Sequence, residues 1–169
     1  MNTLIIVLRI IHIVAGIYWV GAALLMNFVV GPSIGATADA GRQFAGHMMT
    51  KTKFSMSMTV SVILVLVAGT WLYWIDSNEF TSAWMRSGAG IVFGVGAVFA
   101  SIGAVAGFMN GGNNRKLGAL GAQIQGKPNP EQLAQIQAIQ KQQAMIIPLN
   151  TYTLLLAVLC MATARYFIF

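Results

Sequence analysis

Long runs of apolar residues, separated by short polar stretches, organise this sequence. A helix needs roughly 20 mainly apolar residues to cross a bilayer, because each residue adds about 1.5 Å of length across a hydrocarbon core about 30 Å thick. Four runs reach that length, at about residues 4–30, 54–75, 87–109 and 145–168. The pattern therefore predicts an all-α fold: residues 1–169 form a single polytopic membrane domain, a bundle of four transmembrane helices.

Residues that favour turns follow the first three runs. Gly31-Pro32 closes the first predicted span, residues 76–79 (Asp-Ser-Asn-Glu) follow the second, and residues 110–114 (Asn-Gly-Gly-Asn-Asn) follow the third. Glycine, proline and short polar side chains at these points are typical of helix ends. We therefore expect each of these spans to end there.

The polar segment before the fourth span has its own helical signals. Asn129, Pro130 and Glu131 have the order of an N-cap, a proline at the first helical position and an acid in the first turn. Leu133, Ile136 and Ile139 then form a narrow apolar stripe, which can pack on a continuation of the third span. We expect a helical hairpin at about residues 115–144, on the cytoplasmic side.

Composition supports the membrane assignment and adds an orientation. The chain is 57% hydrophobic and 8% charged. It has too few polar side chains to form the surface of a water-soluble protein, so a lipid bilayer is its expected partner. Most basic residues fall between spans 1 and 2 or between spans 3 and 4: Arg42, Lys51, Lys53, Arg115, Lys116, Lys127 and Lys141. The positive-inside bias then predicts a protein of the bacterial cytoplasmic membrane with cytoplasmic basic loops and both termini periplasmic. No basic stripe interleaved with aromatic residues indicates nucleic acid.

Catalysis without a cofactor has little support in the sequence. The carboxylates are Asp39, Asp76, Glu79 and Glu131, all in predicted loops or helix starts, so no acid pair or Ser-His-Asp set lies within a span. The single cysteine, Cys160, excludes a CxxC motif, and no glycine-rich phosphate loop is present. Whether the chain is an enzyme stays open.

Ionisable residues within the spans are the strongest candidates for function, because burying a charge in a bilayer is costly. In span 1, Arg9 lies one turn nearer the outer surface than His12, and in span 4 Arg165 lies one turn outside Met161. Arg86, at the start of span 3, adds a third guanidinium at a similar level. A haem with outward propionates needs cations at the rim and an axial ligand about one turn deeper. The layering predicts haem b in the outer half, with His12 as the axial ligand and Met161 as the candidate second ligand, and electron transfer is the candidate role.

Other roles account for parts of the same pattern. A neutral His12 can hydrogen-bond a neighbouring helix, and the three arginines can snorkel to headgroups. Copper is an alternative, because His12, or His47 with Met48 and Met49, offers ligands suited to Cu(I). His47 cannot join His12, since the two are separated by roughly 20 Å of depth.

Span 3 carries pairs of small residues four apart: Gly90 and Gly94, Gly96 and Ala100, Gly103 and Gly107. Such pairs allow helix backbones to approach closely. Packing within the chain is the simplest interpretation. A homo-oligomer, or a non-catalytic accessory or scaffold role in a larger membrane complex, is the alternative that uses the same surface.

The first span also carries a family resemblance. Residues 8–12 (Leu-Arg-Ile-Ile-His), Trp19-Val20-Gly21 and Val30-Gly31-Pro32 resemble the first span of the bacterial copper-resistance D family and related small membrane proteins. The spacing of histidine and tryptophan is similar, more loosely, to that of the haem-containing membrane protoporphyrinogen oxidase. Where that enzyme has Leu-Pro-Arg, this chain has residues 24–27 (Leu-Leu-Met-Asn). The resemblance implies that His12 is the ligand position to test.

Overall fold

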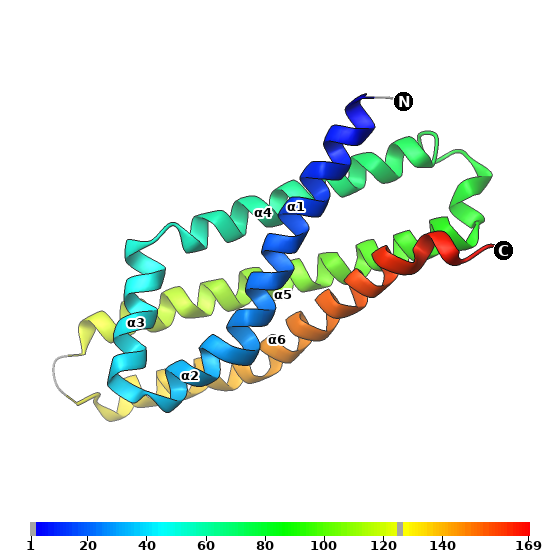
Figure 1. Cartoon of the computed structure of the whole chain (residues 1–169). Helices are drawn as coiled ribbons and strands as arrows, with labels where there is room; N and C mark the ends of the chain where they lie inside the picture. Colours follow the sequence, from blue (N-terminus) through cyan, green and yellow to red (C-terminus); the bar gives the residue numbers. More distant parts are fainter. Residues whose placement is uncertain (1–2, 125–126) are drawn as a thin grey trace.

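The computed structural model describes residues 3–124 and 127–169, and these form helices joined by short loops (Figure 1). The elements in chain order are α1 (Thr3–Leu25), the π-helical turn η1 (Met26–Val30), α2 (Gly31–Ala36), α3 (Ala38–Lys51), α4 (Phe54–Asp76), the 3-10 turn η2 (Ala83–Arg86), α5 (Gly88–Gln123), α6 (Pro130–Thr163) and the 3-10 turn η3 (Ala164–Tyr166). Four helical stretches are long and apolar enough to cross a membrane. The predicted all-α architecture is confirmed, and the chain is an integral membrane protein.

The spanning helices form two antiparallel pairs. α1 packs mainly on α4, and α5 packs along α6, whereas contacts between the two pairs are fewer. A core of mostly small apolar side chains joins the pairs at Ala15, Trp19, Ala23, Val62, Val65, Ala104 and Leu154. Figure 1 shows the start of α1, the α4–α5 loop and the chain end together at one end of the bundle, which we name the Arg9 end. Helix α3, the end of α5 and the start of α6 lie at the opposite end, which we name the α3 end.

Gly31-Pro32 does not end the first helix, so that prediction is wrong. The Gly31 N–H donates to the carbonyl of Met26, five residues back, in a π-helical turn. This wide turn interrupts the regular hydrogen-bond ladder just before Pro32, which has no N–H to contribute. A proline is tolerated where the ladder is already interrupted, and the helix therefore continues through α2 to Ala36.

The π-helical turn also carries a polar link between the two helix pairs. Asn27 lies within it, and its Nδ2 donates to Thr151 Oγ1 at 2.7 Å and to Asn150 Oδ1 at 3.4 Å. Asn150 in turn donates through its own Nδ2 to the Gly103 carbonyl at 2.7 Å. In an apolar medium such groups need partners, so this network fixes α1 against α6.

Residues 110–114 do not interrupt the third helix either, because Gln143 of α6 bonds two of their asparagines. Gln143 Nε2 donates to Asn110 Oδ1 at 2.9 Å and to Asn114 Oδ1 at 2.7 Å. α5 therefore runs on to Gln123, and α6 begins at Pro130; residues 125 and 126 of the predicted hairpin lie outside the described residues. The N-cap prediction is confirmed, since Asn129 Oδ1 accepts from the Gln132 N–H at 2.8 Å within a capping box.

The small residues of α5 are used inside the chain. A Cβ added to Gly103 would lie 2.8 Å from Leu154 Cδ2, and one added to Gly96 would lie 2.9 Å from the Cβ of Cys160. Both partners are on α6, so these glycines let the two helices approach to a distance that alanine would prevent. Intramolecular packing, the simplest interpretation of the pattern, therefore accounts for these two positions.

Candidate functional site: a cavity between the helix pairs

A cavity of about 1260 Å³ lies between the two helix pairs at the Arg9 end. It is larger than the roughly 300–1,000 Å³ of most ligand pockets, and its lining is mainly apolar. Residues of α1, α4, α5 and α6 and of the α4–α5 loop contribute to its walls. The helices of each pair pack closely on each other, whereas contacts between the pairs are fewer, and the cavity lies in the space between the pairs.

The cavity brings together four of the five residues that the sequence assigned to a haem site. Arg9 and His12 line it from α1, and Met161 and Arg165 line it from α6 and η3. Arg86 is exposed on η2 and is not among the lining residues, so its place beside a cofactor has no support from this cavity. The two sides of the cavity therefore each contribute an arginine and, one turn deeper, a side chain that can ligate a metal.

His12 is held in one defined orientation. Its Nδ1 lies 2.9 Å from the Val65 carbonyl oxygen of α4. A carbonyl can only accept, so Nδ1 carries the proton and donates it. In the neutral ring, Nε2 is then left with a free lone pair, which is the arrangement found in histidines that ligate a metal.

Gly69 makes room for this orientation. It lies one turn after Val65, and a Cβ added to it would lie 2.7 Å from Cε1 and 3.0 Å from Nδ1 of His12. Any side chain there would displace the imidazole from the Val65 carbonyl. Gly69 was not predicted from the sequence, although its position carries a signal. It lies about as many residues before the end of span 2 as His12 lies after the start of span 1, so the two residues lie at a similar depth.

Charged side chains surround the mouth of the cavity. Arg9, Arg165 and Asp76, the last residue of α4, all line it and are exposed. Arg165 Nη2 donates to the hydroxyl of Tyr166 at 2.9 Å, and its guanidinium lies 5.0 Å from that ring's centroid. The rim thus presents two cations and one carboxylate. Asp76 was assigned to a loop by its neighbours in sequence, and only the packing of α4 brings it to the cavity.

On the α6 wall, Met161 is positioned by a glycine of α5. A Cβ added to Gly96 would lie 3.2 Å from the Met161 Cε, so the thioether end packs over the bare backbone of α5. Met161 is partly buried and faces the same cavity as His12. The two side chains come from different helix pairs, which is the arrangement needed for ligands on two faces of a planar group.

Aromatic side chains close part of the cavity near the α4–α5 loop. The Tyr73 hydroxyl donates to the Gly90 carbonyl at 3.1 Å, and the Tyr73 and Trp84 rings meet edge-to-face with centroids 5.3 Å apart. Trp84 stacks in turn on Phe93, at 6.3 Å between centroids. These rings fix the end of α4 to the start of α5 and give the cavity flat apolar walls.

The second metal-site candidate has no comparable support. His47, Met48 and Met49 are consecutive on α3, where each residue is rotated by about 100° from the one before, so their side chains diverge. His47 is exposed. Among the described residues, no group of three or more histidine, cysteine or acidic side chains lies close enough to hold a metal ion.

Comparisons with protein-family models, with curated proteins and with solved structures give no match to this chain. The resemblance of span 1 to the copper-resistance D family therefore stays a prediction from sequence.

Proposed function

We propose that this membrane protein binds haem b in the cavity between its helix pairs, with His12 as the axial ligand, and that it serves in electron transfer. The observation that carries the proposal is the hydrogen bond from His12 Nδ1 to the Val65 carbonyl, because it leaves Nε2 free to ligate iron. The haem would supply one-electron chemistry there.

The other lining residues suit the same ligand. Arg9 and Arg165 at the mouth can form charge-assisted hydrogen bonds with two propionates, and the mainly apolar walls suit the porphyrin faces. Met161, on the opposite helix pair, would hold the iron together with His12 through its thioether sulfur. Among the described residues, no specific contact supports copper binding or a scaffold role.

We further propose that the Arg9 end faces the periplasm. Lys51 and Lys53 flank the end of α3, and Arg115 and Lys116 lie in the last part of α5, so the basic residues concentrate at the α3 end. Positively charged segments are retained on the cytoplasmic side. A cysteine introduced at Glu79, in the α4–α5 loop, should then react with a membrane-impermeant maleimide in whole cells.

The proposal is tested by titrating haemin into the detergent-purified chain and following the Soret band. We expect saturation at about one haem per chain, with a band typical of histidine ligation. Iron-free protoporphyrin is the matched control, because it has the same shape and propionates but offers no metal to His12. We expect it to bind at least about tenfold more weakly, since the axial bond is lost. Equal affinities, or no saturable binding, would contradict the proposal.

A further inference from the structure

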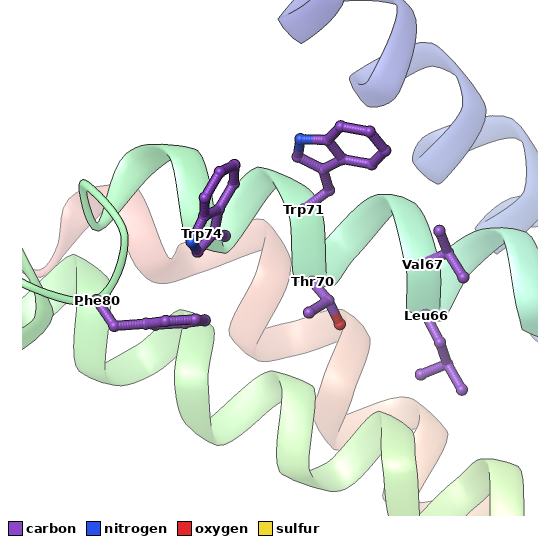
Figure 2. A pocket seen from close by; sticks show the side chains of 6 residues that line it. All are labelled: Leu66, Val67, Thr70, Trp71, Trp74 and Phe80. Atoms are coloured by element: carbon purple, nitrogen blue, oxygen red, sulfur yellow. The ribbon is translucent and has the colours of Figure 1, made fainter.

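A second hollow, on the outward surface of α4, borders the cavity (Figure 2). This groove has a volume of about 480 Å³ and is lined almost entirely by apolar atoms, those of Leu66, Val67, Thr70, Trp71, Trp74 and Phe80. Leu66, Thr70 and Phe80 also line the cavity. The two hollows are thus neighbours with a shared wall, and a molecule in the groove would lie beside whatever the cavity holds.

Thr70 is the polar side chain of this shared wall; it is exposed, and its hydroxyl makes no hydrogen bond to the residues that the structure describes. Threonines elsewhere in the spans bond back to a carbonyl four residues earlier, as Thr59 does to Ser55 and Thr163 to Leu159. In the part of the chain that the structure describes, Thr70 Oγ1 makes no such bond. Figure 2 shows this oxygen on the side of α4 that faces α5. A hydroxyl at membrane depth gains from a partner, so it can donate to an acceptor on a bound molecule.

Phe80 is held at the same wall by an unusual backbone. Asn78, Glu79 and Phe80 have φ values of 48°, 60° and 63°, a left-handed conformation that is sterically unfavourable for side chains other than glycine. The buried Ser77 stabilises this turn, since its Oγ accepts from the Phe80 N–H at 3.1 Å and donates to the Trp74 carbonyl at 3.1 Å. Strained residues of this kind cluster at ligand-binding sites. The turn places the Phe80 ring 6.2 Å from Tyr73, between groove and cavity.

We propose that the groove binds a lipid-soluble quinone. Trp71 is 45% exposed and Val67 55% exposed, so the groove is open to the acyl region, from which an alkyl or isoprenoid tail can enter. The aromatic side chains Trp71, Trp74 and Phe80 can pack against a flat ring, and the Thr70 hydroxyl donates to a ring carbonyl.

Two observations favour a quinone over a phospholipid acyl chain. An acyl chain would fill the apolar groove but would leave the Thr70 hydroxyl without an acceptor. Trp71 and Trp74 also mark the depth of the membrane interface, where polar rings with apolar tails reside. That the bound ring is redox-active rests on the haem proposed for the adjacent cavity. The contacts that bind the ring do not depend on that haem.

The test uses the full-length chain in detergent, haem-free, and decyl-benzoquinone as the probe, followed by quenching of tryptophan fluorescence. We expect saturable quenching for the native chain and an affinity about three- to tenfold lower for Thr70→Val, which keeps the shape but removes one hydrogen bond. Thr59→Val is the matched control on the same helix, because its hydroxyl bonds to Ser55 outside the groove, and it should bind like the native chain.

The outcomes separate this proposal from the haem proposal. Quenching that does not saturate, an unchanged affinity in Thr70→Val, or equal competition by decanol, which has the tail without the ring, would overturn quinone binding. A chain that fails to bind haemin yet shows the Thr70-dependent quenching would overturn the haem proposal alone. With haemin loaded, the quinone should still bind, since the groove and the cavity are separate volumes.

Discussion

Haem binding should be lost when His12 is replaced by alanine. We expect the dissociation constant for haemin to rise by about 100-fold or more, because even changes in groups that only orient a metal ligand cost roughly 10- to 100-fold. The measurement is the Soret titration of the purified variant. His47→Ala is the control, since His47 is an exposed residue of α3 outside the cavity lining; it should titrate like the native chain. A His12→Ala variant with an unchanged Soret band would exclude His12 as the ligand.

Gly69→Ala distinguishes a ligand from a purely structural histidine. The added methyl group would lie 2.7 Å from the His12 Cε1, so the ring must rotate away from the Val65 carbonyl. If His12 ligates haem, the variant should bind haemin with a shifted Soret maximum and altered electron paramagnetic resonance g values. If His12 only joins α1 to α4, the loss of one hydrogen bond lowers stability by about 1 kcal/mol and leaves any haem spectrum unchanged.

Gly103→Ala should destabilise the packing of α5 on α6. Its Cβ would lie 2.8 Å from Cδ2 of Leu154, a fully buried side chain with no space to retreat. Overpacking of this kind costs about 1–3 kcal/mol. The measurement is the unfolding midpoint of the variant in mixed detergent and SDS micelles, followed by far-ultraviolet circular dichroism.

The same helix offers a matched control for this substitution. A Cβ on Gly111 would have no heavy atom within 4 Å, so Gly111→Ala should gain up to about 1 kcal/mol from helix propensity alone. The two variants share the gain in helix propensity and differ in overpacking alone, so their stabilities should differ by about 1–3 kcal/mol. Equal stabilities would mean that α5 and α6 do not pack as closely as in this structure.

Much of the candidate site was predictable from local patterns. The order of Arg9 and His12, and of Met161 and Arg165, follows from residue spacing on helices that cross the membrane in opposite directions, and the four side chains do line one cavity. The spacing did not predict which residues hold the His12 ring in place. The Val65 carbonyl and the bare surface of Gly69 lie on α4, more than fifty residues away, and no local pattern pairs a backbone carbonyl with a particular histidine.

The limits of helices were predicted less well than their existence. Gly31-Pro32 and residues 110–114 have the composition of helix ends, but a π-helical turn accommodates the first and Gln143 satisfies two of the asparagines of the second. In both places the helix continues because of interactions that the residue types alone do not predict. The N-cap at Asn129 was predicted correctly because its hydrogen bonds lie within four consecutive residues.

The sequence by itself determined that this chain crosses a membrane as four helices, because length and apolar composition decide where a segment partitions, whatever its neighbours are. Only the tertiary structure decided that the helices pair as α1 with α4 and α5 with α6, and that the space between the pairs is a cavity. Pairing depends on where small residues of one helix meet large residues of another, as Gly103 meets Leu154 and Gly69 meets His12. Those contacts join distant parts of the chain, and they exist only once the bundle has assembled.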